Sequence, residues 1–297
     1  MGTWQNCFAD PIQSVSSDVY LLKLRDLVYQ IAGIYQPDHK LRFLQDRCHR
    51  RMQQLRVTTL RQYLETLTTG SSRAQELTLL LNEVTVGETC FFRNQPQLDA
   101  LRKTVLPLVL KNKDYFPIRH LRVWSAGCST GEEAYTLAIT LLEETAGLLK
   151  GWNFEIVATD LNERSLERAR AGTYGEYATR NVPAYIRDKY FRSSNGSLEV
   201  SSILKQKVNF SRLNLLDDAR MAFLKNIDVI FCCNVLIYFD CASKSRVIQH
   251  FYNNLLPNCF LFLGHSESLF GVNDRFRLVQ FAGASAYLKP AQQTRVL

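Results

Sequence analysis

The sequence predicts an all-α N-terminal region followed by a larger α/β domain built on a mostly parallel sheet. Apolar residues recur at helical spacing from about residue 15 to 85, where the only proline is Pro37. From about residue 119 onward, short β-branched runs alternate with helical stretches, which is typical of a parallel sheet with helices on both faces. A glycine turn joins the first of these strands to the helix that follows it.

The N-terminal region is expected to be a helical domain spanning residues 15–85. Its apolar stripes predict helices at 19–31, 41–55, 60–67 and 75–82. The second of these helices is strongly basic, because residues 40–56 hold six Lys or Arg residues against one acidic residue, Asp46. A basic helix face is by default a solvated surface, so its charge alone does not identify a partner.

The second domain is expected to span residues 86–290. Its predicted strands lie at 121–124, 154–158, 208–210, 227–231 and 260–263. Between them, the turn signal Ser194-Asn195-Gly196 predicts a small antiparallel β subdomain at about 185–212.

Composition and charge exclude several classes of protein. No apolar run approaches the ~18 residues of a membrane span, and the N-terminus has no signal-peptide core, so we expect a cytoplasmic protein without membrane insertion. The eight cysteines show no C-x-x-C spacing, which favours reduced, buried thiols over a metal site or disulfides. The net charge of +8 fits nucleic acid, an anionic membrane surface or an acidic protein partner.

A nucleoside site is predicted where the first two strands of the second domain end. Gly127 and Gly131 form a turn between strand and helix, and Asp160 ends the second strand, where a carboxylate can hold a ribose diol. Glu132 and Glu133 open the helix and would repel a pyrophosphate, although a helix dipole stabilises acidic residues there in any case. The sulfonium and ammonium groups of S-adenosylmethionine therefore fit this turn better than NAD.

Further motifs carry a family resemblance across residues 20–290. In chain order they are Thr89-x-Phe91-Phe92-Arg93, Trp124-Ser125-Ala126-Gly127-Cys128-Ser129-Thr130-Gly131-Glu132-Glu133, Ala158-Thr159-Asp160, Asn214-Leu215-Leu216, Phe231-Cys232-Cys233-Asn234-Val235-Leu236-Ile237-Tyr238-Phe239 and Gly264-His265-Ser266-Glu267. Together they closely resemble the CheR chemoreceptor methyltransferases. The resemblance implies a Rossmann-like class I methyltransferase domain with a small antiparallel β subdomain, preceded by an all-α domain.

The resemblance also implies a function and a set of site residues. The implied enzyme uses S-adenosylmethionine to methylate receptor glutamates and leaves S-adenosylhomocysteine, without a metal. Its donor site would comprise Gly87, Thr89, Arg93, Gly127, Glu132, Asp160, Asn214, Leu215, Cys233 and Asn234. Arg93 and Tyr238 would position the substrate carboxylate beside the methyl group.

Two positions depart from the family pattern. The family usually has Asn where this chain has Gly87, so one polar contact to the donor is expected to be missing. It usually has Arg where this chain has Cys233. Neither residue is expected to touch the transferred methyl group, so we expect altered donor affinity and retained activity.

The basic helix is the expected docking site of the receptor. The resemblance assigns recognition of an acidic receptor coiled coil to such a helix, and here the candidate residues are Arg42, Arg47, Arg50 and Arg51. A monomer without nucleic-acid partners is expected. Two alternatives stay open: a methyltransferase acting on RNA through the same basic helix, and a donor-binding regulatory module without activity.

Overall fold

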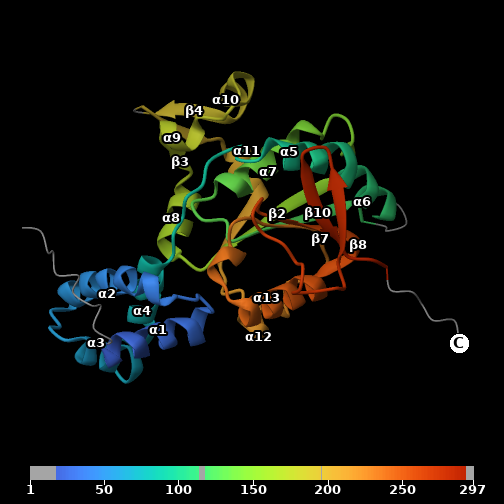
Figure 1. Ribbon diagram of the computed structural model, residues 1–297. Coiled ribbons are helices and arrows are strands. Elements are labelled where there is room, and N and C mark those ends of the chain that lie inside the picture. The colour runs from blue at the N-terminus through green and yellow to red at the C-terminus, as the bar shows by residue number, and fades with distance from the viewer. Residues whose placement is uncertain (1–17, 114–117, 195, 292–297) are drawn as a thin grey trace, which may run out of the picture.

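A helical unit precedes an α/β unit in the computed structural model, which describes residues 18–113, 118–194 and 196–291 (Figure 1). The helical unit comprises α1 (Val19–Ala32), the short 3-10 helix η1 (Asp38–Lys40), α2 (Leu41–Leu55), α3 (Leu60–Thr68) and α4 (Arg73–Val84). The four predicted α-helices are confirmed, each within two residues at its ends.

Capping residues and apolar stripes explain why these segments are helical. The Asp18 side chain accepts a hydrogen bond from the backbone N–H of Tyr20 and caps α1, and Thr59 caps α3 through the N–H of Gln62. Gly33 ends α1 in the left-handed conformation, with φ 67°. The stripes meet in a core of their own that includes Leu24, Leu44, Cys48, Tyr63, Leu67 and Leu80.

A buried ion pair lies inside this helical core. Two nitrogens of Arg51 donate to the two carboxylate oxygens of Glu76, at 2.9 and 2.7 Å, and the Tyr63 hydroxyl donates to the same carboxylate at 2.9 Å. The Arg51 side chain is only 4% exposed. The expectation that Arg51 binds a receptor is therefore wrong, since its helical position faces the core and its charge is neutralised by α4.

The α/β unit is built on a seven-stranded sheet. Its strands are β1 (His120–Ala126), β2 (Asn153–Asp160), β6 (Val208–Arg212), β7 (Ile227–Cys232), β8 (Leu255–Leu263), β9 (Arg277–Phe281) and β10 (Ala284–Leu288). The order across the sheet is β6-β2-β1-β7-β8-β10-β9, and β10 runs antiparallel to both of its neighbours, β8 and β9. All five predicted strands are confirmed, as is the mostly parallel sheet. On one side of β1 lie β2 and β6. On its other side lie β7 and β8, so the strand order reverses between β1 and β7.

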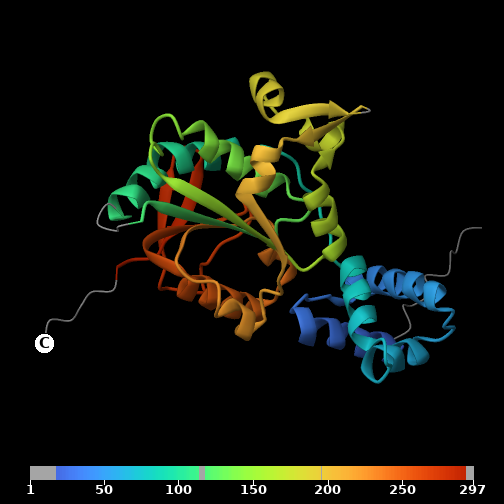
Figure 2. The ribbon, with the colours of Figure 1, turned by 180° about the vertical axis from the view of Figure 1, so that it is seen from behind.

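Helices cover both faces of this sheet (Figures 1 and 2). They are α5 (Gln95–Ala100), the π-helical turn η2 (Leu101–Val105), α6 (Leu106–Lys113), α7 (Glu132–Glu143), α8 (Glu163–Ala171), α11 (Ser202–Lys207), α12 (Asp218–Met221) and α13 (Cys241–Asn254). Every residue of β7 is buried, as expected for a central parallel strand packed on both sides. Within this core, Phe231 stacks on Phe262 with ring centroids 4.5 Å apart.

A second, three-stranded antiparallel sheet projects from the α/β unit. It consists of β3 (Thr173–Tyr174), β4 (Phe191–Ser194) and β5 (Ser197–Val200), accompanied by α9 (Glu176–Thr179) and α10 (Ala184–Tyr190). The hairpin predicted around residues 194–196 is confirmed, although Asn195 itself lies outside the described residues. The subdomain differs from the predicted span of 185–212, because it begins at β3 and β6 belongs to the large sheet. β3 has only two residues and thus no alternating pattern that the sequence could reveal.

The helical unit is joined to the loop that follows β7. Ile34 and Phe239 form an antiparallel β-bridge, and the Tyr35 N–H donates to the Tyr238 carbonyl at 2.8 Å. The side-chain amide of Asn214 donates to the Ile31 carbonyl at 2.6 Å. The end of α1 is thus held against segments that follow β6 and β7.

Most of the cysteines that the structure describes are buried. Cys48, Cys90, Cys128, Cys232 and Cys259 are buried as free thiols, Cys233 is partly buried and Cys241 is exposed, whereas Cys7 lies outside the described residues. Within residues 18–113, 118–194 and 196–291, no helix combines the length and apolar character needed to cross a bilayer.

Replacing Glu76 by Ala is expected to lower the free energy of unfolding of the helical unit by about 3–5 kcal/mol, because the Arg51 charge would stay buried without a partner. Urea denaturation followed by circular dichroism measures this loss. The control is Arg61→Ala, which breaks the exposed Arg61–Glu65 pair and should leave the midpoint nearly unchanged. Similar effects of the two variants would contradict a special contribution of the buried pair.

Candidate functional site

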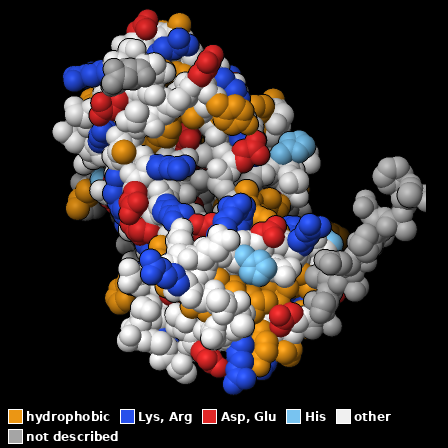
Figure 3. Space-filling view, turned by 90° about the vertical axis from the view of Figure 1, so that its left-hand side faces the viewer, with side chains coloured by type: hydrophobic (Ala, Val, Ile, Leu, Met, Phe, Trp, Pro, Cys, Tyr) orange, Lys and Arg blue, Asp and Glu red, His pale blue; other side chains and the backbone are white. Residues whose placement is uncertain are grey.

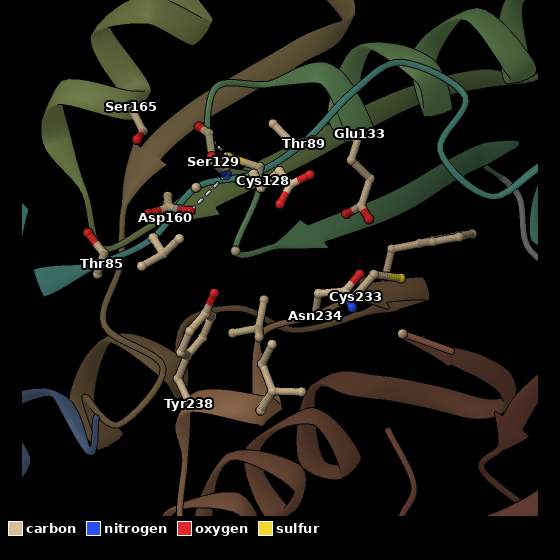
Figure 4. A pocket seen from close by; sticks show the side chains of 18 of the residues that line it. Thr85, Thr89, Cys128, Ser129, Glu133, Asp160, Ser165, Cys233, Asn234 and Tyr238 are labelled. Atoms are coloured by element: carbon tan, nitrogen blue, oxygen red, sulfur yellow. Dashed lines mark hydrogen bonds between the residues drawn. The ribbon is translucent and has the colours of Figure 1, made fainter. Parts of the chain in front are cut away.

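A cavity of about 470 Å³ lies where β1, β2, β7 and β8 end (Figure 4). This is the edge at which open α/β sheets bind ligands, beside the point where the strand order reverses. Ten of the residues predicted for the site line the cavity: Gly87, Thr89, Arg93, Gly127, Asp160, Asn214, Leu215, Cys233, Asn234 and Tyr238. The structure therefore brings together side chains that are spread over 150 positions of the sequence, from Gly87 to Tyr238.

The glycine turn after β1 forms one wall. Gly127 has φ 81°, and a Cβ added there would lie 2.4 Å from the Val235 side chain, so only glycine lets the turn approach the loop after β7. The N–H groups of Gly127 and Cys128 donate to the Thr159 carbonyl at 2.7 and 2.9 Å. These bonds tie the turn to the end of β2 and place it beside Asp160.

Asp160 is held in one orientation by backbone donors. One of its carboxylate oxygens accepts from the Ser129 N–H at 2.7 Å and the other from the Asn162 N–H at 2.8 Å. Burial raises the pKa of Asp160, and these hydrogen bonds oppose the rise. Each oxygen keeps a further lone pair, so the side chain can still accept from the two hydroxyls of a diol.

The two glutamates at the start of α7 face different surroundings. Glu132 is buried, accepts from the Thr130 hydroxyl at 2.6 Å and lies outside the main cavity, beside a second hollow on the other side of residues 86–89. Glu133 lines the main cavity, toward the end opposite Asp160 (Figure 4). Consecutive helical residues point about 100° apart, so only one of the pair can face the ligand, and the sequence does not reveal which.

Glu133 is a carboxylate without a cationic partner. It accepts from the Ser125 hydroxyl at 2.7 Å and forms no ion pair with any residue in the described ranges. Burial raises its pKa to about 7, while the Ser125 and Cys233 hydrogen bonds and the Arg93 charge act in the opposite direction. A buried, unpaired carboxylate of this kind is suited to a cationic group of a ligand.

Residues 85–94, which we call the strap, cross the cavity without helix or strand structure, turn at residues 91–93 and carry Thr89 and Arg93. The strap is fixed on both sides, because the Thr85 hydroxyl accepts from the Asn162 amide at 2.8 Å and the Phe91 N–H donates to the Ala178 carbonyl at 2.9 Å. Arg93 is exposed and uses one nitrogen to donate to the Glu88 carbonyl at 2.9 Å. Its other N–H groups remain available at the cavity mouth.

The loop after β7 carries Cys233, Asn234 and Tyr238. Tyr238 lies across the cavity from Asp160 (Figure 4), and partial burial raises its pKa, so at neutral pH it remains a phenol that can donate a hydrogen bond. Asn234 adopts a left-handed conformation with φ 61°. This loop is braced by Glu267, whose carboxylate accepts from the N–H groups of Asn234, Gly264 and Ile237 at 2.8, 2.6 and 3.2 Å.

Some lining residues were not predicted from the sequence. Ala32 and Ile34 belong to the helical unit and complete the cavity beside Leu215, which no local pattern reveals. Asn214 uses its amide on Ile31, as described above, so its side-chain nitrogen is engaged by the helical unit. The motif Gly264-His265-Ser266-Glu267 carries part of the family resemblance, but no local pattern reveals the contacts by which Glu267 braces the loop.

The basic residues of α2 lie apart from the cavity, and none of them lines it. Arg42 and Arg50 are exposed, and Arg47 stacks on the Phe43 ring at 4.5 Å. Arg50 also lies 3.9 Å from Glu83 of α4. Three of the four predicted docking residues are thus at least partly accessible, and Arg51 is the buried exception.

Comparison with known proteins agrees with this architecture. Residues 21–85 match the family model of the CheR methyltransferase all-alpha domain, and residues 87–284 match that of the CheR methyltransferase SAM binding domain. Chemotaxis protein methyltransferase 2 of Vibrio cholerae serotype O1 is 34% identical over 93% of this chain and 94% of its own length. The chemotaxis protein methyltransferases of Borreliella burgdorferi and Escherichia coli (strain K12) are 32% and 33% identical, over 91% and 88% of this chain and 95% and 88% of their own lengths.

Binding of S-adenosylmethionine is expected to strengthen as the pH rises through about 7, because a cationic ligand favours the ionised form of Glu133. Below this pH a proton leaves Glu133 on binding, so affinity falls by up to about tenfold per pH unit. Calorimetry between about pH 5.5 and 7.5, in buffers of different ionisation enthalpy, measures both affinity and proton release.

Two variants make this test specific. Glu133→Gln should bind with little pH dependence, whereas Asp160→Ala should bind more weakly at every pH and keep the slope. A slope that persists in Glu133→Gln would assign the pH dependence to another group and contradict the role given to Glu133.

Proposed function

Because the chain belongs to the CheR family of chemotaxis protein methyltransferases, which use S-adenosylmethionine, we propose that it esterifies glutamate side chains of methyl-accepting chemoreceptors. The products are glutamate methyl ester and S-adenosylhomocysteine, and the process is adaptation in chemosensory signalling. The family, the enzyme class and the methyl donor predicted from the sequence are confirmed by the matches above.

One observation carries the proposal: a single cavity combines acidic side chains in its interior with a guanidinium and a phenol on its other walls. Asp160 offers a carboxylate for a ribose diol, and Glu133 offers an unpaired carboxylate for an ammonium group. A cavity of about 470 Å³ is of the size that proteins use for cofactors. The residues present thus fit the methyl donor, which supplies an electrophilic methyl group on a sulfonium.

The substrate needs no general base. A glutamate side chain has a reference pKa near ~4.3, so it is already a carboxylate at neutral pH. The enzyme therefore has to align the reacting atoms and exclude water, and such positioning can lower a barrier by on the order of 7–11 kcal/mol. The strap and the helical unit both line the cavity, so both would help to exclude water from bound substrates.

Arg93 and Tyr238 are proposed to present the substrate carboxylate. Arg93 keeps N–H groups free for one carboxylate oxygen, which leaves the other oxygen to attack the methyl group. A bidentate grip would reduce the nucleophilicity of both oxygens, and the bond from Arg93 to the Glu88 carbonyl limits such a grip. Tyr238, as a neutral phenol, can orient the substrate carboxylate by donating a hydrogen bond.

The receptor is proposed to dock as an acidic coiled coil on the basic side of α2. Figure 3 faces the side of the molecule on which α2 lies and shows Lys and Arg side chains spread across it among fewer acidic ones. The contact residues we retain are Arg42, Arg47 and Arg50. The enzyme would meet both the receptor's cytoplasmic segments and the methyl donor in the cytoplasm, and we propose that it acts there as a monomer. In this proposal, residues 15–85 recognise the receptor and residues 86–290 catalyse the transfer.

The function is tested by incubating the protein with methyl-labelled S-adenosylmethionine and cytoplasmic receptor fragments. We expect label on the receptor that mild base releases, because carboxyl methyl esters are base-labile. An RNA substrate should remain unlabelled. Label on RNA alone, or no transfer with donor binding intact, would favour the RNA methyltransferase or the regulatory module instead.

Arg93→Ala is expected to lower kcat by about 10²–10³-fold, the usual effect of removing one donor to a reacting oxygen, and to change the Kd for S-adenosylhomocysteine far less. Steady-state kinetics with receptor fragments and calorimetry separate the two quantities. Arg119→Ala, at the opposite edge of the sheet before β1, is the matched control. Equal losses of turnover and donor affinity would assign Arg93 to the donor and not to the substrate.

The double variant Arg47→Glu/Arg50→Glu is expected to raise KM for the receptor by about tenfold or more at low ionic strength, because charge steering would be reversed. The difference from wild type should shrink as salt screens the charges. Arg61→Glu, an exposed change on α3, serves as the control. Unchanged methylation by the double variant at low salt would remove α2 from the docking surface.

A further inference from the structure

Ser129, in the turn between β1 and α7, combines two unfavourable features. Its backbone has φ 49°, in the left-handed region that costs a residue with a Cβ but not glycine. Its hydroxyl oxygen is buried and has no hydrogen-bond partner among the residues that the structure describes. Glycine would avoid both features, and the turn already uses it at Gly127 and Gly131.

The Ser129 hydroxyl lies beside the strap at the place where Gly87 has no side chain. A Cβ added to Gly87 would stand 2.5 Å from this oxygen and 3.9 Å from the Ser165 hydroxyl. Ser129 and Ser165 both line the main cavity and lie on the same side of it, near Asp160 (Figure 4). The Ser129 N–H is itself bonded to the Asp160 carboxylate.

No contact among residues 18–113, 118–194 and 196–291 accounts for this hydroxyl. It does not cap α7, whose N-cap is Gly131 and lacks a side-chain hydrogen bond. The position next to Asp160 also means that a diol held by that carboxylate would reach Ser129. A strained residue with an unpaired buried hydroxyl in a cavity is the pattern expected when a ligand supplies the missing partner.

We propose that Ser129 is a donor-binding residue: its hydroxyl, which occupies the space left free by the absent Gly87 side chain, forms a hydrogen bond with a ribose hydroxyl of the methyl donor. This inference rests on the proposed function, because it takes the cavity as the donor site. It also changes the expectation for Gly87: the absent side chain there does not leave a missing contact, since Ser129 makes that contact from the adjacent turn.

The first experiment pairs protein variants with ligand variants. Wild type and Ser129→Ala are titrated by calorimetry with S-adenosylhomocysteine and with its 2′-deoxy and 3′-deoxy analogues. Ser129→Ala should bind S-adenosylhomocysteine about five- to tenfold more weakly, which is the usual effect of one lost hydrogen bond. It should bind one of the two deoxy analogues as tightly as wild type does, because that analogue lacks the partner of Ser129. Ser211→Ala, an exposed serine on β6, is the control.

The second experiment separates a binding role from a structural one. Ser129→Gly should raise the melting temperature of the free protein, because it relieves the left-handed strain, and should weaken donor binding as Ser129→Ala does. A serine kept for structure would give a lower melting temperature in both variants. Melting curves of all variants also establish that each is folded.

The third experiment tests the coupling between Gly87 and Ser129. Gly87→Ala should weaken donor binding, because the new Cβ displaces the Ser129 hydroxyl, and its backbone φ lies outside the left-handed region, so the change is not strained in itself. In Gly87→Ala/Ser129→Ala, the new Cβ of residue 87 has the Cβ of residue 129 as its nearest neighbour, at 3.7 Å, which is an ordinary van der Waals contact. The double variant should therefore bind no more weakly than Ser129→Ala alone.

The outcomes distinguish this inference from the proposed function. Equal losses for all three ligands, or no loss, would overturn the role of Ser129, as would additive effects of the Gly87 and Ser129 changes. In either case wild type would still bind S-adenosylhomocysteine in a one-to-one complex and the function would stand. Absence of any binding by wild type would overturn the proposed function itself.

Discussion

The site depends on one topological constraint, the reversal of strand order between β1 and β7. Loops that leave neighbouring strands in opposite directions cannot fill the space between them, so a crevice opens at the carboxyl edge of the sheet. The glycine turn after β1 and the loop after β7 are its two walls, and Gly127 sets how closely they approach. Glu267 then holds the second wall through three backbone N–H groups, so that Tyr238 keeps its place relative to the turn.

Charge is distributed so that the two substrates are kept apart. The interior contains the carboxylates of Asp160 and Glu133, both with pKa values raised by burial, and these favour a cationic ligand. Arg93 lies exposed on the strap and attracts an anion. In the proposed reaction, a glutamate side chain would therefore be attracted to the mouth of the cavity and repelled from its interior.

Much of this architecture follows from local patterns in the sequence. Periodicity predicts the helices and strands because burial on one or two faces dictates which positions are apolar, and the turn at Gly127 with Asp160 marks the crevice. Features that depend on three-dimensional packing do not follow. The burial of Arg51 depends on Glu76 in another helix, and the choice between Glu132 and Glu133 depends on the exact rotation of α7. The walls formed by Ala32 and Ile34 come from a segment about 90 positions before the first strand.

The β-bridge between Ile34 and Phe239 has a consequence for how such proteins can be recombined. Because the backbone next to Tyr238 pairs with the segment after α1, the helical unit cannot be exchanged as an independent module on a passive linker. A chimaera that exchanges helices to redirect the enzyme to another receptor must keep residues 31–35 matched to the loop of the recipient. If docking occurs on α2 as proposed, specificity could change on the outer surface of that helix alone, whereas the end of α1 would change only together with the loop after β7.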